Sequence, residues 1–567
     1  MAMRKHCDQR LAALEAERLS FFYHWQEIAQ FIIPRRYRWL VSPNQSNRGS
    51  PNASKIVDET ATMALRVLSS GMMAGMTSPG RPWNRLSLPD MELTESSPVK
   101  VWLYEAQKRM SRVMAESNYY TVKAVQVSDL PAFGTAPMII YEDAEDVICC
   151  HNSAAGEFYT WNDIRGFSAG LYRKITKTVQ QLVDEYGIDN CSVNVRASFE
   201  NGAQALHREV VVGHAIEKND TKLGGGLVPA LFPWREVYWE VGSDTACLLR
   251  SKGFHEQPFS CPRWEVSGND AYGRSPAMEA LGSVKQLQQE QRDKAMVINK
   301  GARPAMLADV TMRNEPASLL PNGVTYVANL SQSGGMRPIY EPNPAFIGMI
   351  REDIKEVQDR INRVFYVDLF MMISQMDTVR TATEIDARRE EKLIQLGPVL
   401  ERNQSESLDV EIERIFAIMV RRSMPHWQEG RDGLLPMPPP ELQNMSLQIE
   451  YVSMLAEAQR AASTSAIERL AGFVGTLAAA NPEALDNIDT DEMIDEYADL
   501  LGVAPKVVRA TAEVMKLRQQ RAQQQQQQAQ MQQSMAAAQG AKTMSETDVG
   551  GGQNALSKMI GASGMAS

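Results

Sequence analysis

A repeating apolar stripe between Phe346 and Tyr366 constrains the fold of this chain more than any other segment. Its apolar residues recur at alternating intervals of three and four positions, which places them along one side of an α-helix. They are Ile347, Ile350, Ile354, Val357, Ile361 and Val364. Four positive and four negative residues lie between them, so the outer face is polar and carries no net charge. Such a narrow stripe predicts a helix that packs against a partner helix.

The best partner is a helix predicted over Pro276–Asn299, antiparallel to the first. Ser275 is a favourable N-cap, and Pro276 suits the first helical position. The apolar stripe of this second helix is thin, because Gln288 and Gln291 interrupt it. The intervening residues 300–345 contain turn dipeptides and a predicted strand at Val324–Val327.

After the first helix, the Met-rich segment Val367–Arg380 shows no helical period, and we predict a loop. Thr381 and Glu384 then form a capping box of the S/T-x-x-E type, which predicts a long helix from about Ala382 to Arg422. Gly397-Pro398 predicts a kink in that helix. The residues expected on its buried side are Ile385, Leu396, Val399, Leu408, Ile412, Ile415 and Met419.

The N-terminal half has the pattern of an α+β body. Amphipathic helices are predicted over residues 11–32, 56–76 and 99–117, and Gly71-x-x-x-Gly75 indicates close approach of two helices. Short apolar runs between turns predict strands, followed by a helix that ends at Gly187. The strands are expected at Met138–Tyr141, Val147–Cys150, Phe158–Trp161 and Ala169–Thr176, and the α+β pattern continues through Val193–Phe199, Glu209–Glu217, Glu236–Val241 and Cys247–Phe254.

The C-terminal part is predicted to be a small helical region followed by a polar tail. Pro425–Pro440 indicates an extended linker and Leu447–Val452 a strand. Helices are expected over residues 455–479 and 490–501, the second capped by Asp489. For the Gln-rich segment 506–539, a helix and a disordered tail are equally supported. The Gly/Ser-rich residues 541–567 are expected to be disordered.

The overall charge and the cysteines limit the function. The 567 residues carry a formal net charge of −10, which disfavours a broad nucleic-acid-binding surface but does not exclude weak contact with DNA. No C-x-x-C pair occurs among the six cysteines. There is also no signal-peptide pattern and no apolar run long enough to span a bilayer. These features favour a cytoplasmic site of synthesis and no membrane partner.

Candidate catalytic and metal-binding residues are few. Cys149-Cys150-His151 could contribute to a zinc site, but consecutive strand residues point to opposite faces, so no metal is expected. Acidic groups could bind nuclease metals, although loops and helix caps explain them better. These groups are Glu390-Glu391, Asp143 with Glu145 and Asp146, and Asp489 with Asp491 and Glu492. The basic, aromatic stretch Arg35–Leu40 could touch nucleic acid, but an anchored exposed loop is favoured.

Several segments, in their order and spacing, resemble the head-to-tail connector (portal) family of short-tailed phages, the podoviruses. The helix, loop and long kinked helix that begins Thr381-Ala-Thr-Glu384 resemble that family's second stem helix, tunnel loop and tunnel helix. The other similar segments are Arg10–Arg36, Ser69–Trp83, Phe133–Asp143, Pro262–Ala277 and Tyr451–Arg460. The resemblance covers most of the chain to about residue 465.

The resemblance implies a portal-protein fold, with α+β wing, two-helix stem, small α/β clip, long kinked tunnel helix and helical crown. It implies a wing at 1–273, stem helices at 274–299 and 346–366, a clip at 300–345, a tunnel loop at 367–380, a tunnel helix and second wing part at 381–422, a linker at 423–440, a crown at 441–520 and a tail at 521–567. No cofactor and no enzymatic activity are expected.

The implied function is a dodecameric ring at one capsid vertex, through which double-stranded DNA is packaged, retained and ejected. The implied partners are further copies of the chain, the terminase large subunit, the major capsid protein and scaffold, and the tail adaptor and ejection proteins. The residues expected to face DNA without sequence preference are Met371, Met372, Gln375, Met376, Asp377 and Arg380. Two alternatives stay open, a non-channel coiled-coil scaffold or tail adaptor of a virion and a metal-dependent nuclease.

Overall fold

A computed structural model describes most of the chain as two compact units. The described residues are 2–41, 55–80, 82–88, 90, 93, 96–219, 229, 231–243, 248–304, 306–307, 337–338, 343–374, 396–442, 448–451, 467–477, 489–500, 507–508 and 511–546. The first unit comprises Met1–Ser87, Glu105–Met437 and Leu447–Leu455. The second comprises Leu88–Tyr104, Pro438–Ser446 and Ala456–Ser567.

Helices and strands are both abundant, as the α+β pattern predicted. The helices are α1 (Ala2–Phe31), η1 (Pro34–Arg36), α2 (Tyr37–Val41), α3 (Thr60–Met76), α5 (Ser97–Glu116), α6 (Tyr119–Phe133), α7 (Val179–Tyr186), η3 (Ile188–Asn190), α8 (Val193–Glu200), α9 (Ala203–Leu206), α11 (Pro276–Ala302), α12 (Pro344–Val364), α13 (Val367–Ser374), η5 (Gln404–Leu408), α15 (Asp409–Gln428), η6 (Pro440–Leu442), α17 (Thr490–Leu500) and α18 (Thr511–Glu546). The strands are β1 (Asn84–Ser87), β2 (Met138–Asp143), β3 (Val147–Asn152), β4 (Phe158–Asn162), β5 (Ser168–Thr178), β6 (Glu209–Lys218), β7 (Trp234–Glu240), β8 (Arg250–Phe254), β9 (Phe259–Ser260), β10 (Met306–Leu307), β11 (Arg337–Pro338) and β12 (Gln448–Tyr451).

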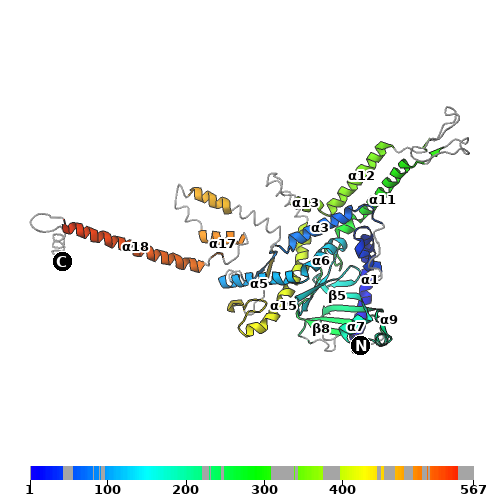
Figure 1. The fold of residues 1–567 in the computed structure, drawn as a ribbon, viewed down its shortest axis with the longest axis horizontal. Helices are drawn as coiled ribbons and strands as arrows, with labels where there is room; N and C mark the ends of the chain where they lie inside the picture. Colours follow the sequence, from blue (N-terminus) through cyan, green and yellow to red (C-terminus); the bar gives the residue numbers. More distant parts are fainter. Residues whose placement is uncertain are drawn as a thin grey trace, which may run out of the picture. The chain divides into compact units, whose positions relative to one another are not determined.

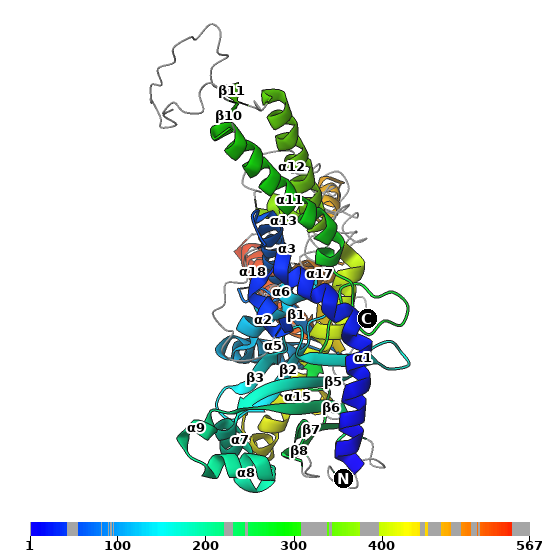
Figure 2. The ribbon, with the colours of Figure 1, turned by 90° about the vertical axis from the view of Figure 1, so that its right-hand side faces the viewer.

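The largest sheet is antiparallel, has the order β4-β5-β6-β7-β8 and is covered by helices on both faces. In β6, Ala215 pairs with Tyr172 of β5 and Val237 of β7. Successive strand residues point to opposite faces. Ala215 therefore packs against α1, while Val212 packs against α7 and α8. Figure 2 shows α1 running alongside this sheet.

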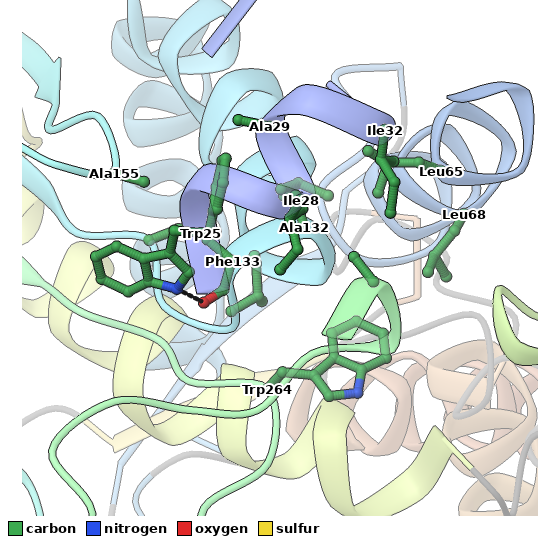
Figure 3. Close-up of a cluster of buried hydrophobic side chains, with 14 of the residues drawn as sticks. Trp25, Ile28, Ala29, Ile32, Leu65, Leu68, Ala132, Phe133, Ala155 and Trp264 are labelled. Carbon is green, nitrogen blue, oxygen red and sulfur yellow. Dashed lines mark hydrogen bonds between the residues drawn. The ribbon is translucent and has the colours of Figure 1, made fainter. Parts of the chain in front are cut away.

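The main core of the first unit joins α1, α3, α6 and α11. Trp25 of α1 is fully buried, and its Nε1 donates a hydrogen bond to the carbonyl oxygen of Phe133 at 2.9 Å (Figure 3). The Trp25 ring also contacts Phe158 and Tyr272. A second sheet, of order β3-β2-β9, contributes Ile139 and Phe259 to the same core.

The helices α11 and α12 leave this body side by side (Figure 1). The hydroxyl of Ser275 caps α11 by accepting a hydrogen bond from Met278 N at 3.2 Å, as predicted. Asn343 Oδ1 caps α12 by accepting a hydrogen bond from Ala345 N at 3.0 Å. Of the residues between the helices, β10 and β11 form an antiparallel pair, and the strand expected at 324–327 lies outside the described residues.

Two predictions of local structure in the first unit were wrong. Residues 367–374 form α13 and not a loop, because Leu369 and Phe370 pack on the core. The long helix continues through Gln428, with Pro425 inside it, so the linker does not begin after Arg422. A π-helical turn at Gln404–Leu408 lies downstream of Gly397-Pro398, where the kink stays a prediction.

The second unit is helical where it is described. Asp489 Oδ1 caps α17 by accepting hydrogen bonds from the backbone N–H groups of Asp491 and Glu492, as predicted. An ion pair joins Arg518 of α18 to Asp491, with a nitrogen–oxygen distance of 2.6 Å. The α18 helix settles the alternatives for residues 511–539, and disorder predicted from 541 was wrong for residues 541–546. Among the described residues, no helix combines the length and apolarity needed to cross a membrane.

Candidate functional site

The apolar side chains of α11 and α12 are buried near the body and exposed toward the far end of the two helices. Ile354, Val357 and Ile361 are buried in the main core, while Ile350 and Val364 are partly buried against it. Ile347 is half-buried. The residues Met296 and Ile298 of α11 and Phe346 and Met349 of α12 are exposed.

A sharp turn separates α12 from α13. Tyr366 occupies this turn with φ of 55°, a left-handed conformation that is uncommon for residues other than glycine. Phe370 then lies over Gly71 of α3, so closely that a Cβ atom on residue 71 would come within 2.0 Å of the phenylalanine ring. The close approach predicted from the Gly71 motif is therefore made, with Phe370 of α13 as its partner.

The structure places only part of the residue set expected to face DNA. Met371 lies on α13 with 42% of its surface exposed, and Met372 follows it on the same helix. Gln375, Met376, Asp377 and Arg380 lie outside the described residues, as do the predicted cap residues Thr381 and Glu384.

A buried charge cluster holds the long helix to α6. Glu411 and Lys123 are both completely buried, and their side chains form an ion pair with a nitrogen–oxygen distance of 2.9 Å. Glu411 also accepts hydrogen bonds from Tyr119, Ser260 and Ser407. Burial lowers the pKa of Lys123 and raises that of Tyr119, because a low-polarity environment disfavours the charged form. We call Lys123, Glu411 and these three hydroxyl partners the Glu411 cluster.

A second buried ion pair holds the π-helical turn. The guanidinium of Arg263 donates to both carboxylate oxygens of Glu406, at 3.2 Å from Nε and 2.5 Å from Nη2. Its remaining N–H groups donate to Asn162 Oδ1 and to the carbonyl oxygens of Gly166 and Asp270. Because a π turn contains one extra residue, the adjacent side chains of Glu406 and Ser407 both face the body. Glu406 pairs with Arg263, and Ser407 belongs to the Glu411 cluster.

The sequence interpretation missed both ion pairs. Their only sequence signals are Lys123 and Gln126 inside an apolar helical run, and Glu406 and Glu411 beside the predicted buried positions Leu408 and Ile412. Such charges on an apolar face indicate buried partners, but the sequence does not say which ones.

The described residues do not assemble a metal site. Cys149 Sγ and His151 Nε2 are 3.6 Å apart, but no group of three or more His, Cys, Asp or Glu side chains is gathered within the described ranges. Asp143 accepts hydrogen bonds from the backbone of Glu145 and Asp146 and so stabilises the β2–β3 turn. Glu390 and Glu391 lie outside the described residues.

The basic stretch Arg35–Leu40 is largely engaged within the body. Arg36 forms an ion pair with Asp129 at 2.9 Å, and the guanidinium of Arg38 lies over the Trp39 ring. Leu40 is buried. These contacts favour the structural interpretation, an anchored surface turn.

The chain, whose first unit is a sheet body with a projecting helix pair, is similar to bacteriophage proteins. The family model of the bacteriophage head to tail connecting protein matches residues 4–508. The chain is 42% identical to the portal protein of Salmonella phage epsilon15 over 98% of both chains. It is 41% identical to the probable portal protein of Bordetella phage BPP-1 over 92% of this chain and 91% of that one. This chain belongs to the bacteriophage head-to-tail connecting protein family.

A solved structure with a lower similarity is the neck of an empty GTA particle. It shares 10% identity with this chain, over 74% of this chain and 86% of the other, with a TM-score of 0.32.

Proposed function

We propose that the chain assembles into a dodecameric ring at one capsid vertex, through which double-stranded DNA is packaged, retained and later ejected. The observation that carries this proposal is the 42% identity to a portal protein over nearly the full length of both chains. The net charge of −10 is compatible with it, because a conduit should bind passing DNA weakly.

The proposal assigns a region of the ring to each group of elements described above. The antiparallel helices α11 and α12 serve as the stem, and the residues between them serve as the clip, where the terminase large subunit and later the tail adaptor would dock. The sheet body serves as the wing, which would contact the major capsid protein and scaffold. The α17 helix would belong to the crown, and α18 would run from the crown into the tail region. Ejection proteins are further expected partners inside the virion.

The segment after α12 lines the narrow part of the channel in this proposal. Met371 and Met372, followed by Gln375, Met376, Asp377 and Arg380, would meet DNA through adaptable and weakly polar side chains. Deleting residues 368–377 would be a poor test, because α13 also packs on the core. Arg380→Glu and Met371→Glu are better, and we expect intact rings with impaired packaging or genome retention. Normal retention by both variants would contradict the assignment.

The proposal as a whole is tested by electron microscopy of the purified chain with two-dimensional class averages. We expect rings with a central hole wide enough for duplex DNA. Rods, filaments or small oligomers under several salt conditions would instead support the alternative of a coiled-coil scaffold or tail adaptor.

A further inference from the structure

The two glutamines that interrupt the apolar stripe of α11 bind the segment that precedes α3. Gln288 is 1% exposed, and its Oε1 accepts hydrogen bonds from the backbone N–H groups of Val57 and Asp58 at 2.6 and 2.9 Å. Its Nε2 donates to the carbonyl oxygen of Asp58 at 2.9 Å. The Gln288 amide therefore pairs with the backbone much as a neighbouring strand would.

The carboxylate of Asp58 joins both projecting helices. Its Oδ2 accepts hydrogen bonds from Gln291 of α11 at 2.7 Å and from Gln358 of α12 at 2.9 Å. Its Oδ1 accepts from the backbone and hydroxyl of Thr60, the first residue of α3. Burial opposes the charge, but these hydrogen bonds outweigh it and hold the pKa of Asp58 below its ordinary value.

The same helix α3 also packs against α13. Asp58 fixes its N-terminal end, and about three turns further along α3 Gly71 contacts the ring of Phe370. Because α13 follows α12 after the left-handed Tyr366, α3 is held to this helical pair at two separate points. Loosening one point should shift the helices relative to the body.

We infer that Asp58 is a positioning residue of the proposed channel, which with Gln288, Gln291 and Gln358 locks α11 and α12 to the start of α3. We call these four residues the Asp58 lock. An apolar seam alone tolerates sliding of one helix along another, whereas directional hydrogen bonds specify one register. The lock therefore sets the direction in which the helices leave the body. Its role in a channel rests on the proposed function, but its effect on helix position does not.

The direct test measures the distance between the projecting helices and the body in the full chain. Genetically encoded non-canonical amino acids that carry spin labels would replace Met349 of α12 and Val193 of α8, both exposed. Labelled chains would be diluted into unlabelled ones, so that only distances within one chain are recorded. We expect the single narrow distance distribution of the wild type to be lost in Asp58→Ala.

Two variants separate positioning from general destabilisation. Asp353→Ala removes an exposed carboxylate of α12 and should keep the wild-type distribution. Asp58→Asn keeps the side-chain size, and the glutamine amides can turn to pair with it, so a narrower distribution than in Asp58→Ala is expected. Circular dichroism checks that each variant is folded. A wild-type distribution in folded Asp58→Ala would overturn the inference.

The biological consequence is measured separately in assembled particles. We expect Asp58→Ala to form rings but to retain less packaged DNA than Asp353→Ala. Retention equal to that of Asp353→Ala, despite a changed distance distribution, would count against the channel role and leave the positioning role intact. A failure of the wild type to form rings would instead contradict the proposed function.

Discussion

The long helix and the projecting helices of the first unit are attached to the body by different kinds of contact. The long helix uses the Glu411 cluster, in which two completely buried charges pair and every partner is another buried side chain. The projecting helices use the Asp58 lock, in which a half-buried carboxylate accepts hydrogen bonds from neutral amides, and the ring of Phe370 over Gly71.

The two attachments should differ in how much the loss of one hydrogen-bond or ion-pair partner destabilises them. Removing one partner of a buried ion pair leaves a charge with neither water nor counter-ion, which is very unfavourable. A half-buried carboxylate that loses one amide can still be hydrated. The long helix is thus a fixed part of the body, whereas substitutions in the Asp58 lock should weaken the attachment of the projecting helices by smaller steps.

The largest expected effect is that of Lys123→Met. Because it leaves Glu411 buried and unpaired, we expect a loss of about 3–5 kcal/mol in unfolding free energy. Chemical denaturation followed by tryptophan fluorescence would measure it. The double variant Lys123→Met with Glu411→Leu should recover part of the loss, because it removes the unpaired charge but leaves the hydroxyls of Tyr119, Ser260 and Ser407 without this acceptor. A single variant as stable as the wild type would show that the two kinds of attachment do not differ as described.

The next effect concerns the contact of α13 with α3. In Gly71→Ala the new Cβ atom would overlap the ring of Phe370, so we expect a destabilisation of about 1–3 kcal/mol and displacement of α13. Gly282→Ala is the matched control, because residue 282 of α11 has open space around it. That substitution should stabilise the helix slightly. Hydrogen exchange of residues 367–374 would report the displacement, and equal exchange in both variants would contradict it.

A smaller effect is expected from Gln288→Leu. This change leaves the backbone N–H groups of Val57 and Asp58 without their acceptor, at a cost on the order of 1 kcal/mol. Gln289→Leu is the control, because Gln289 is exposed and, among the described residues, donates its side-chain hydrogen bond to Asp293 on its own helix. Comparison of their thermal unfolding measures the difference. If Gln288→Leu were the more stable of the two, the amide would not be needed to hold this segment.

Helix and strand positions in the first unit could largely be predicted from the sequence, because period and caps are local properties. The helix predicted to end at Gly187 is an example of such a local signal, because α7 ends at Tyr186 with Gly187 as its C-cap. The three- and four-residue spacing likewise identified α12, which begins at Pro344 instead of Phe346.

The contacts between distant segments could not be predicted. Glu411 lies 288 residues from Lys123, and Asp58 lies 300 residues from Gln358, so no local pattern relates them. The α13 helix was missed for a similar reason, since its apolar residues are ordered by packing on α3 and not by a period of their own. Gln288 and Gln291 did signal a polar partner, but not its identity.

The smallest expected effect is a pH dependence of the Asp58 lock. The pKa of Asp58 is lowered from its ordinary value of 3.8, so its carboxylate stabilises the folded state above that value. This contribution is lost as the pH falls below 3.8 and passes through the pKa of the folded state.

Asp58→Asn lacks the titrating group. We therefore expect the difference in thermal stability between wild type and Asp58→Asn to shrink between about pH 6 and about pH 3. The control is the same comparison between wild type and Asp353→Asn, which removes an exposed carboxylate of α12. If both differences changed equally, the acid response would belong to exposed carboxylates in general, and the half-buried lock would not be the adjustable attachment.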